Sequence, residues 1–234
     1  MLVAGFPAGS WGTNCYVVAP GKGEECVIID PGQDAAPGVE DVVRENGLKP
    51  VAVVLTHGHI DHMWSVVPVC GAHDVPAFIH PDDRVLLTDP ARALSAETRE
   101  AISGALFGGR VTFGEPDDVR ELTDGAVLEL AGLRLAVSHA PGHTRGSVTF
   151  GTEDGEAPVL FSGDLLFKNG VGRTDLPGGD YQELLASLAR VCLPLPDETL
   201  VLSGHGAETT IGQERAANPF LQEAAPFAPP SRGL

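Results

Sequence analysis

The sequence predicts an α/β fold in which sheets are covered by helices. Eight short runs rich in β-branched residues recur along the chain, and each is bounded by Gly, Pro or Asp. These runs are CYVVA, CVIID, VAVVL, PAFIH, LRLAVSH, SVTFG, PVLFSGD and TLVLSGH. Helical stretches lie between some of them, and this mixture favours layers of sheet and helix. Hydrophobic residues make up 43% of the 234 residues, enough for a substantial core.

Three segments are expected to form helices, at 38–46, 95–107 and 180–193. The last has the strongest signals, because Asp180 suits the N-cap position and Glu183 follows three residues later. Its leucines then repeat on one face, as in an amphipathic helix packed on a core.

The chain is expected to form a single domain over residues 1–221. Its first fifty residues are typical of a strand meander, with a hairpin turn at the PGKGEE segment. The segment 81–118 is more helical and more charged, and is interpreted as a helical cap beside a site. The Pro-rich residues 222–234 are expected to form a flexible tail.

The charge argues against some partners. There are 15 basic and 32 acidic residues, a net charge of −17, so nucleic acid is not an expected partner. No window approaches 18 apolar residues, so no membrane association is expected. No signal peptide is recognised, and the four cysteines form no CxxC pair, so we expect buried, reduced thiols and a cytoplasmic location. The sequence assigns no oligomeric state.

One segment concentrates the residues that bind metals. LTHGHIDHMW, residues 55–64, follows an apolar run and contains His57, His59, Asp61 and His62. Residues two apart in an extended loop point the same way, so His57 and His59 can reach one ion together. Asp61 and His62 follow as the chain turns towards a helix, and they could bind a neighbouring ion. Packing alone rarely explains four such residues in six positions.

Three further apolar runs end in a metal-binding residue. LRLAVSH leads through a Pro-Gly turn to His143, PVLFSGD ends in Asp164, and TLVLSGH leads to His205. In layered folds with parallel strands, such side chains meet at one carboxyl edge.

The ligand count is sufficient for two divalent metal ions. His57, His59 and His143 supply three nitrogens to one ion, while Asp61, His62 and His205 serve the other. Asp164 can bridge both ions with its two oxygens. Histidine and carboxylate ligands without thiolate suit Zn²⁺ first, with Fe²⁺ or Mn²⁺ as alternatives, and two such ions could share a hydroxide.

The motifs THGHIDH, PGHT, SGD and SGHG, together with GTNCYVV and VIIDPG near the start, resemble the metallo-β-lactamase superfamily in order and spacing. The resemblance extends from about Gly12 to Leu221. It implies an αββα four-layer sandwich and the two-ion ligand set given above.

Within that superfamily, GDLLFKNGVGRTDLPGGD and GHGAETTIGQERAANPFL most resemble short-form glyoxalase II, the hydroxyacylglutathione hydrolases. The resemblance implies hydrolysis of S-lactoylglutathione or a related acyl-thiol by a metal-bridging hydroxide. Asp61 and Asp164 would act as catalytic residues that hold the second ion and orient the hydroxide.

The thiol-recognition residues depart from the long form of that group. Asp175 and Ala207 stand where the long form has tyrosines that contact glutathione, and the helical C-terminal domain of the long form is not expected here. Lys168 and Arg173 are the candidates to meet a substrate carboxylate. The expected partner is therefore a small-molecule acyl-thiol whose thiol and acyl group stay open.

Other activities remain as alternatives. Mononuclear-iron persulfide dioxygenases share the HxHxDH pattern and a GRTD segment like residues 172–175. Lactonases of the same superfamily have nearly the same ligands. A nuclease is disfavoured by the net charge, and a metal-binding module without turnover is disfavoured because no ligand is missing.

Overall fold

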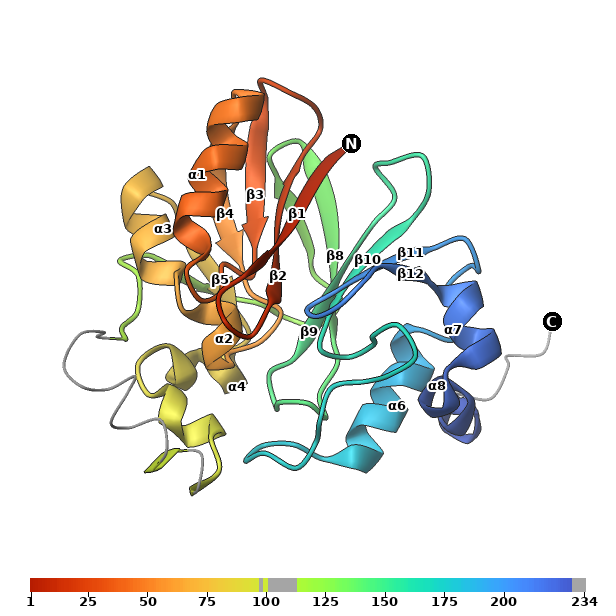
Figure 1. The fold of residues 1–234 in the computed structure, drawn as a ribbon. Coiled ribbons are helices and arrows are strands. Elements are labelled where there is room, and N and C mark those ends of the chain that lie inside the picture. The colour runs from red at the N-terminus through yellow and green to blue at the C-terminus, as the bar shows by residue number, and fades with distance from the viewer. Residues whose placement is uncertain (97–98, 101–112, 229–234) are drawn as a thin grey trace.

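The computed structural model describes residues 1–96, 99–100 and 113–228. In this part of the chain, two six-stranded sheets lie face to face between two layers of helices (Figure 1). Helices α1 and α3 cover the outer face of the first sheet, and α6, α7 and α8 cover that of the second. This is the expected αββα sandwich.

The first sheet is formed by the N-terminal half of the chain. Its order is β1 (Leu2–Ala8), β2 (Thr13–Ala19), β3 (Glu25–Ile29), β4 (Lys49–Val54), β5 (Ala77–Ile79) and β6 (Val119–Glu121). The first three strands are antiparallel, and β3 to β6 run parallel to one another.

The second sheet is formed by the C-terminal half. Its order is β12 (Thr209–Thr210), β11 (Leu200–Ser203), β10 (Val159–Gly163), β9 (Val148–Thr152), β8 (Leu133–His139) and β7 (Val127–Leu130). Its pairs are antiparallel except β10 and β11. Strands β8, β10 and β11 therefore point in the same direction.

The helices follow in chain order as α1 (Ala35–Asn46), α2 (Ile60–Met63), α3 (Val66–His73), α4 (Pro81–Arg84), η1 (Val85–Leu87), η2 (Pro90–Ala93), α6 (Tyr181–Val191), α7 (Ile211–Ala217), α8 (Pro219–Glu223) and η3 (Ala225–Phe227). The Asp180 side chain caps α6 as predicted, because it accepts hydrogen bonds from the backbone N–H groups of Gln182 and Glu183.

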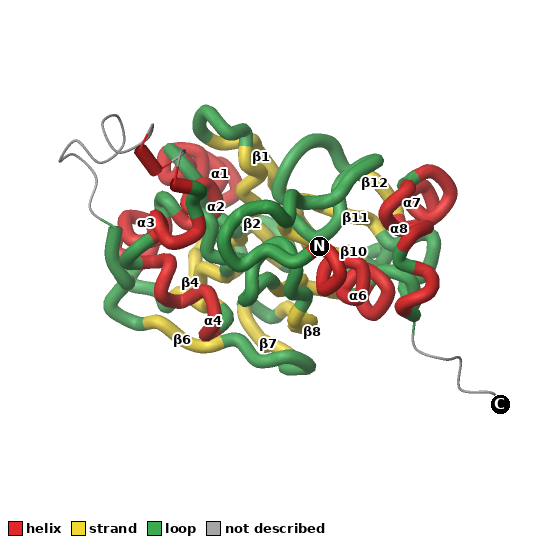
Figure 2. Tube along the Cα trace, turned by 90° about the horizontal axis from the view of Figure 1, so that it is seen from below, coloured by secondary structure: helices red, strands yellow, loops and turns green. Residues whose placement is uncertain are grey.

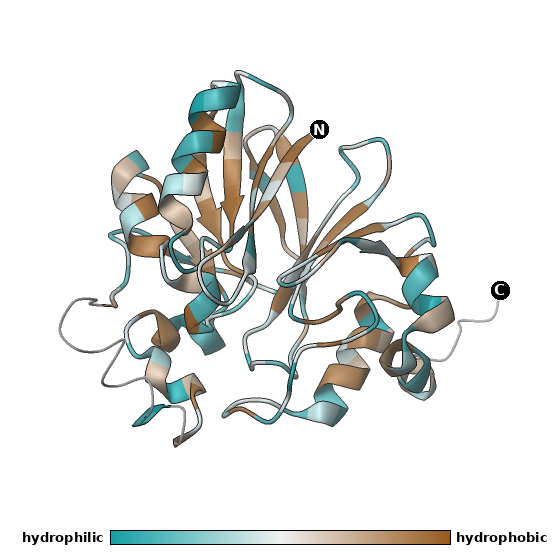
Figure 3. Ribbon diagram, in the orientation of Figure 1, coloured by the Kyte–Doolittle hydropathy of each residue, from teal (hydrophilic) through white to brown (hydrophobic). Residues whose placement is uncertain are grey.

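The core has three layers, and strand residues alternate between them. In β3, Ile28 packs outward against α1, whereas Val27 and Ile29 point inward towards the second sheet. Both faces are buried, so the strands are almost continuously apolar. Figure 3 shows this as brown strands, with hydrophilic turns on the outer helices.

All eight predicted runs form strands, and the segments at 38–46 and 180–193 fall on α1 and α6. Most of the predicted helix at 95–107 lies outside the described residues. In the expected cap, 81–118, the described part forms α4, η1 and η2 before β6 begins the return to the sheet. In the expected tail, 222–228 continues through α8 and η3, with Ala224 buried against α6.

Strands β4, β8, β10 and β11 end at the same edge of the two sheets. Figure 2 looks onto this edge, where loops face the viewer. The two sheets are joined here, because Asn14 N–H donates to Gly204 O at 2.7 Å and Val148 N–H donates to Thr56 O at 2.8 Å. The loops that carry the predicted ligands are therefore attached to strands that hydrogen bonds hold together.

No described helix is long and apolar enough to cross a membrane. The four cysteines, Cys15, Cys26, Cys70 and Cys192, are buried free thiols. Burial raises the pKa of the Cys26, Cys70 and Cys192 thiols to about 12, so they stay protonated at neutral pH.

Candidate metal centre

The structure brings all seven predicted ligands together at this edge. Five are buried, and Asp61 and His205 are half-buried. The loop after β4 and helix α2 supply four of them, and the loops after β8, β10 and β11 supply one each. The seven residues are His57, His59, Asp61, His62, His143, Asp164 and His205.

These side chains fall into two groups of potential ligands. One atom from each of His57, His59 and His143 lies within 4.8 Å of the others, and the same holds for Asp61, His62 and His205. Both groups were predicted from the sequence, and a third set, His57, His62 and Asp164, connects them.

Asp164 lies between the two groups. Its Oδ2 is 3.3 Å from His143 Nε2 in the first group, and its Oδ1 is 3.3 Å from His62 Nε2 in the second. Oδ2 is also 3.7 Å from His205 Nε2. The carboxylate therefore faces both groups, which is the position of a bridging ligand.

The donor atoms fit divalent ions. The Nε2 atoms of His57, His59 and His143 and the Oδ1 atom of Asp164 are buried and make no hydrogen bond. A buried polar atom without a partner costs about 1–3 kcal/mol. Four such atoms within one cluster are explained if they coordinate cations, and neutral imidazole with carboxylate suits zinc, iron or manganese.

The outer nitrogens of two histidines are fixed by Asp30 and Thr56. Thr56 Oγ1 donates its hydrogen to Asp30 Oδ2 at 2.6 Å, so at 3.1 Å it accepts the Nδ1–H of His57. His62 Nδ1–H donates to the same Asp30 oxygen at 2.9 Å. Both rings therefore direct Nε2 towards the centre.

His143 is fixed by the loop that follows Asp164. Its Nδ1–H donates to Arg173 O at 2.7 Å, which again leaves Nε2 free for a metal. Gly172 N–H donates to Asp164 O at 3.0 Å, and a Cβ on Gly172 would lie 2.2 Å from that oxygen. Only glycine allows this loop to approach the centre so closely.

The protonation states of His57, His59 and Asp61 suit cation binding, whereas burial lowers the pKa of His62 but the carboxylates of Asp61 and Asp164 outweigh it and raise this pKa, so a cation must displace a proton there. Burial and the neighbouring His143 lower the pKa of His59 to about 3, and burial with the neighbouring His62 lowers that of His57. Burial raises the pKa of Asp61, but the adjacent His62 and His205 outweigh it and hold this pKa below its usual range. At neutral pH the site thus offers uncharged imidazoles of His57 and His59 and the carboxylate of Asp61.

A family model described as the metallo-beta-lactamase superfamily matches residues 8–205, a span that holds all seven residues. The chain belongs to the metallo-β-lactamase superfamily. Members of this superfamily are metal-dependent hydrolases that typically bind two ions, and the two residue groups of this chain have the corresponding composition.

Relatives in the superfamily share most of this chain. An uncharacterized protein of Mycobacterium leprae (strain TN) is 47% identical over 223 residues, which are 95% of this chain and 99% of the relative. The hydroxyacylglutathione hydrolase GloC of Haemophilus influenzae is 31% identical over 224 residues, which are 92% of this chain and 96% of GloC.

Two solved structures have the same fold at substantial identity. BLEG-1, described as a B3 metallo-beta-lactamase, is 42% identical with a TM-score of 0.81, and the match covers 94% of this chain and 99% of BLEG-1. TTHA1623 in a di-iron-bound form is 38% identical with a TM-score of 0.74, over 94% and 100% of the two chains. The likeness to both extends over nearly the whole sandwich.

A cavity of about 420 Å³ opens onto the candidate metal centre. Arg173 lines this cavity, whereas Lys168 lies exposed outside its lining. The structure therefore places one of the two predicted substrate-binding residues at the cavity. The lining residues are Trp11, His59, Ile60, Asp61, Leu94, His143, Asp164, Phe167, Arg173, Leu176 and His205.

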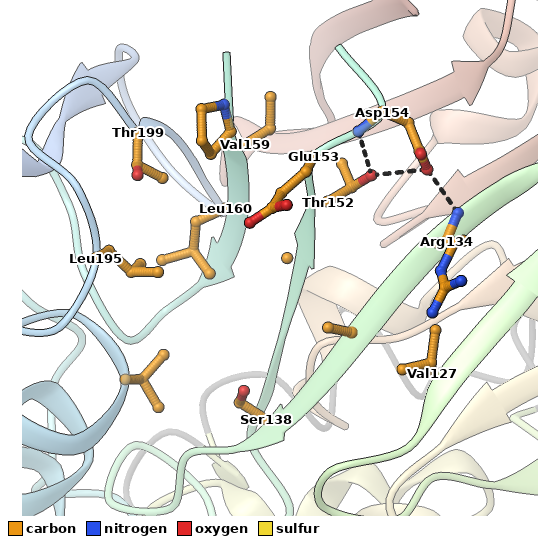
Figure 4. Close-up of a pocket in the computed structure, with 14 residues that line it drawn as sticks. Val127, Arg134, Ser138, Thr152, Glu153, Asp154, Val159, Leu160, Leu195 and Thr199 are labelled. Carbon is orange, nitrogen blue, oxygen red and sulfur yellow. Dashed lines mark hydrogen bonds between the residues drawn. The ribbon is translucent and has the colours of Figure 1, made fainter.

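A larger cavity, of about 540 Å³, lies on the outer face of the second sheet beside α6 (Figure 4). Arg134, Glu153 and Leu160 are among its lining residues, and none of the seven metal-centre residues is. Arg134 and Ser138 alternate in β8 with residues buried between the sheets, which explains their outward direction. The larger of these two cavities is therefore not the one that opens onto the candidate metal centre.

Sequence reasoning missed the residues that support the ligands. Asp30 and Thr56 orient two histidines, and Thr13 Oγ1 donates to Asp61 Oδ2 at 2.9 Å. Asp83 accepts hydrogen bonds from two ligand loops. Asp30 had a usable signal, because it directly follows an apolar strand in VIIDPG, as Asp164 does in its own segment.

Proposed function

We propose that this protein is a thioester hydrolase of the glyoxalase II type, which converts an acyl-thiol to an acid and a thiol. The observation that carries the proposal is the bridging position of Asp164 between two groups of inward-facing ligands beneath a cavity. The 31% identity with GloC supports it. The proposed partner is a small-molecule acyl-thiol.

The seven candidate ligands would bind two divalent ions. His57, His59 and His143 would hold one, Asp61, His62 and His205 the other, and Asp164 both. Zinc is the proposed metal, with iron or manganese as alternatives, and the di-iron form of TTHA1623 supports testing iron directly. When bound, such ions lower the pKa of a water molecule towards ~7 and polarise a carbonyl oxygen.

Asp61 and Asp164 would supply the negative charge that holds the second ion and would orient the attacking water. Asp61 Oδ2 accepts from Thr13 Oγ1 at 2.9 Å and lies 3.1 Å from His205 Nε2, so its carboxylate has a fixed direction. In the reaction, a C–O bond forms between water and the acyl carbon, and the C–S bond breaks. The sulfur leaves as a thiolate, a good leaving group with a pKa near ~8.5 that needs no acid.

The test is hydrolysis of S-D-lactoylglutathione by protein of measured metal content, followed as thiol release, with a chelated sample as control. Fast turnover that requires metal supports the proposal. Oxygen consumption with a persulfide of glutathione and a single iron would favour the dioxygenase alternative, and turnover of lactones alone would favour a lactonase.

A second candidate is β-lactam hydrolysis, which the 42% identity with BLEG-1 favours. The same ligands would serve attack on a lactam carbonyl, but the leaving nitrogen needs a proton, which a thiolate does not. A chromogenic cephalosporin assayed on the same sample measures this activity beside the thioesterase activity.

A further inference from the structure

The cavity above the seven ligands has mainly apolar walls. These come from segments that are distant in sequence, including the loop after β1, helix α2, the residue after η2 and the loop after β10. Apolar parts of a ligand that contact these walls lose water favourably, whereas a charged group placed against the walls loses water at a cost. The apolar lining residues are Trp11, Ile60, Leu94, Phe167 and Leu176.

Arg173 supplies the single Lys or Arg side chain among the described residues that line the cavity. Its guanidinium is already paired. Arg173 Nε donates to Asp175 Oδ1 at 2.7 Å and its terminal nitrogen donates to Asp175 Oδ2 at 2.8 Å. This two-fold contact uses two of the five N–H donors of the guanidinium and neutralises its charge, and both side chains are more than half exposed.

The backbone holds Arg173 at this place. Its carbonyl oxygen accepts the hydrogen bond from His143, and the neighbouring Gly172 is packed against the Asp164 carbonyl. Asp175 is only two residues away, so its effective concentration at the guanidinium exceeds that of a dissolved anion.

We infer that the thiol half of the substrate carries no carboxylate close to the thioester, and that Asp175 determines this preference by neutralising the charge of Arg173. The inference rests on the proposed thioester hydrolysis and narrows its substrate class. A thiol that carries a carboxylate meets an Arg173–Asp175 pair without net charge, on a chain whose net charge is −17, so it is not attracted. An uncharged thiol is not affected by either charge.

The experiment uses two thioesters that differ by one carboxylate: S-lactoyl-N-acetylcysteamine, which is neutral, and S-lactoyl-N-acetylcysteine, which is anionic. Each rate is normalised to the spontaneous hydrolysis of the same compound. The metal-loaded wild-type protein is expected to have a kcat/KM about tenfold higher for the neutral thioester. Asp175→Asn is expected to lower this ratio about three- to tenfold by lowering the KM for the anionic thioester, an effect that weakens with added salt.

Two variants separate the local effect from others. Asp175→Glu keeps the charge and is expected to retain the preference. Asp41→Asn removes the same charge from α1, where Asp41 pairs with Arg44 at 2.6 Å, and is expected to leave the ratio at the wild-type value. This second variant controls for net charge.

The outcomes distinguish this inference from the proposed function. Failure of metal-loaded protein to hydrolyse either thioester would contradict the thioesterase proposal itself. Hydrolysis of both with equal kcat/KM, or better use of the anionic one, would overturn the inference alone. An unchanged ratio in Asp175→Asn would remove Asp175 as its cause.

Discussion

The carboxylate of Asp83 accepts a hydrogen bond of 2.6 Å from Thr144 Oγ1, and this contact joins α4 to the turn that presents His143. The same carboxylate accepts N–H donors from Gly58 and Gly146, each at 2.9 Å. Gly58 lies between two ligands, so one buried side chain fixes two ligand loops. A Cβ on Gly146 would lie 2.7 Å from Asp83 Cγ, which shows how closely they pack.

We predict that Asp83→Asn weakens the metal centre without touching a ligand. The amide keeps one oxygen but replaces the other with a donor, which faces N–H and O–H groups that also donate. Leaving these groups unpaired is expected to destabilise the protein by about 2–4 kcal/mol and to lower metal affinity. Urea unfolding of the metal-free protein and chelator competition measure the two effects.

Asp82→Asn is the matched control, because Asp82 is the neighbouring residue and its side chain is 57% exposed. It is expected to behave as the wild-type protein in both measurements. Equal stability and metal affinity in the two variants would show that Asp83 does not hold the loops.

Thr56→Val tests the orientation of His57. Valine has nearly the same shape but cannot accept the Nδ1–H of His57 or donate to Asp30. Supporting residues of this kind change metal affinity by about 10–100-fold, and we expect a loss in that range. Thr88→Val, at an exposed position after η1, is the control and is expected to bind metal normally. Unchanged affinity in Thr56→Val would contradict the assigned ring orientation.

The sequence predicted eight of the twelve described strands and the meeting of the candidate ligands at one edge, because both depend on local patterns. β-Branched runs mark strands, and ligands that directly follow such runs meet wherever the strands share an edge. Helix α3 has no such pattern. Its VVPVCGAH segment favours a strand or turn by composition, and it is helical because Val66, Val69 and Cys70 pack on the first sheet.

The supporting hydrogen bonds could not be predicted in the same way. Asp30 and Thr56 are 26 residues apart, and Asp83 and Gly146 are 63 apart. Their contacts exist only after the two sheets have packed. A lone aspartate on a short helix carries no sign of this role, since acidic residues are common near helix starts.

Asp164→Ala tests the bridging ligand. The variant loses the one carboxylate that reaches both groups, so the second ion and turnover are expected to disappear together. We predict a fall in kcat of at least about a hundred- to a thousandfold and a metal content reduced from two ions to one. Elemental analysis of the same sample used for kinetics measures both. Full activity with two ions bound would contradict the bridging role.

Metal removal is expected to destabilise the folded protein. The inward-facing nitrogens of His57, His59 and His143 have no other partner, so an ion stabilises only the folded state. At a free metal concentration one hundred times Kd, the gain is about 2.7 kcal/mol, which raises Tm. His59→Gln is expected to reduce this metal-dependent increase in Tm. His73→Gln is the control, because His73 pairs with Glu40 at 2.8 Å on the outer helices and should keep the full increase. If metal raises Tm equally in both variants, the ion that stabilises the protein binds elsewhere and the first ligand group is wrong.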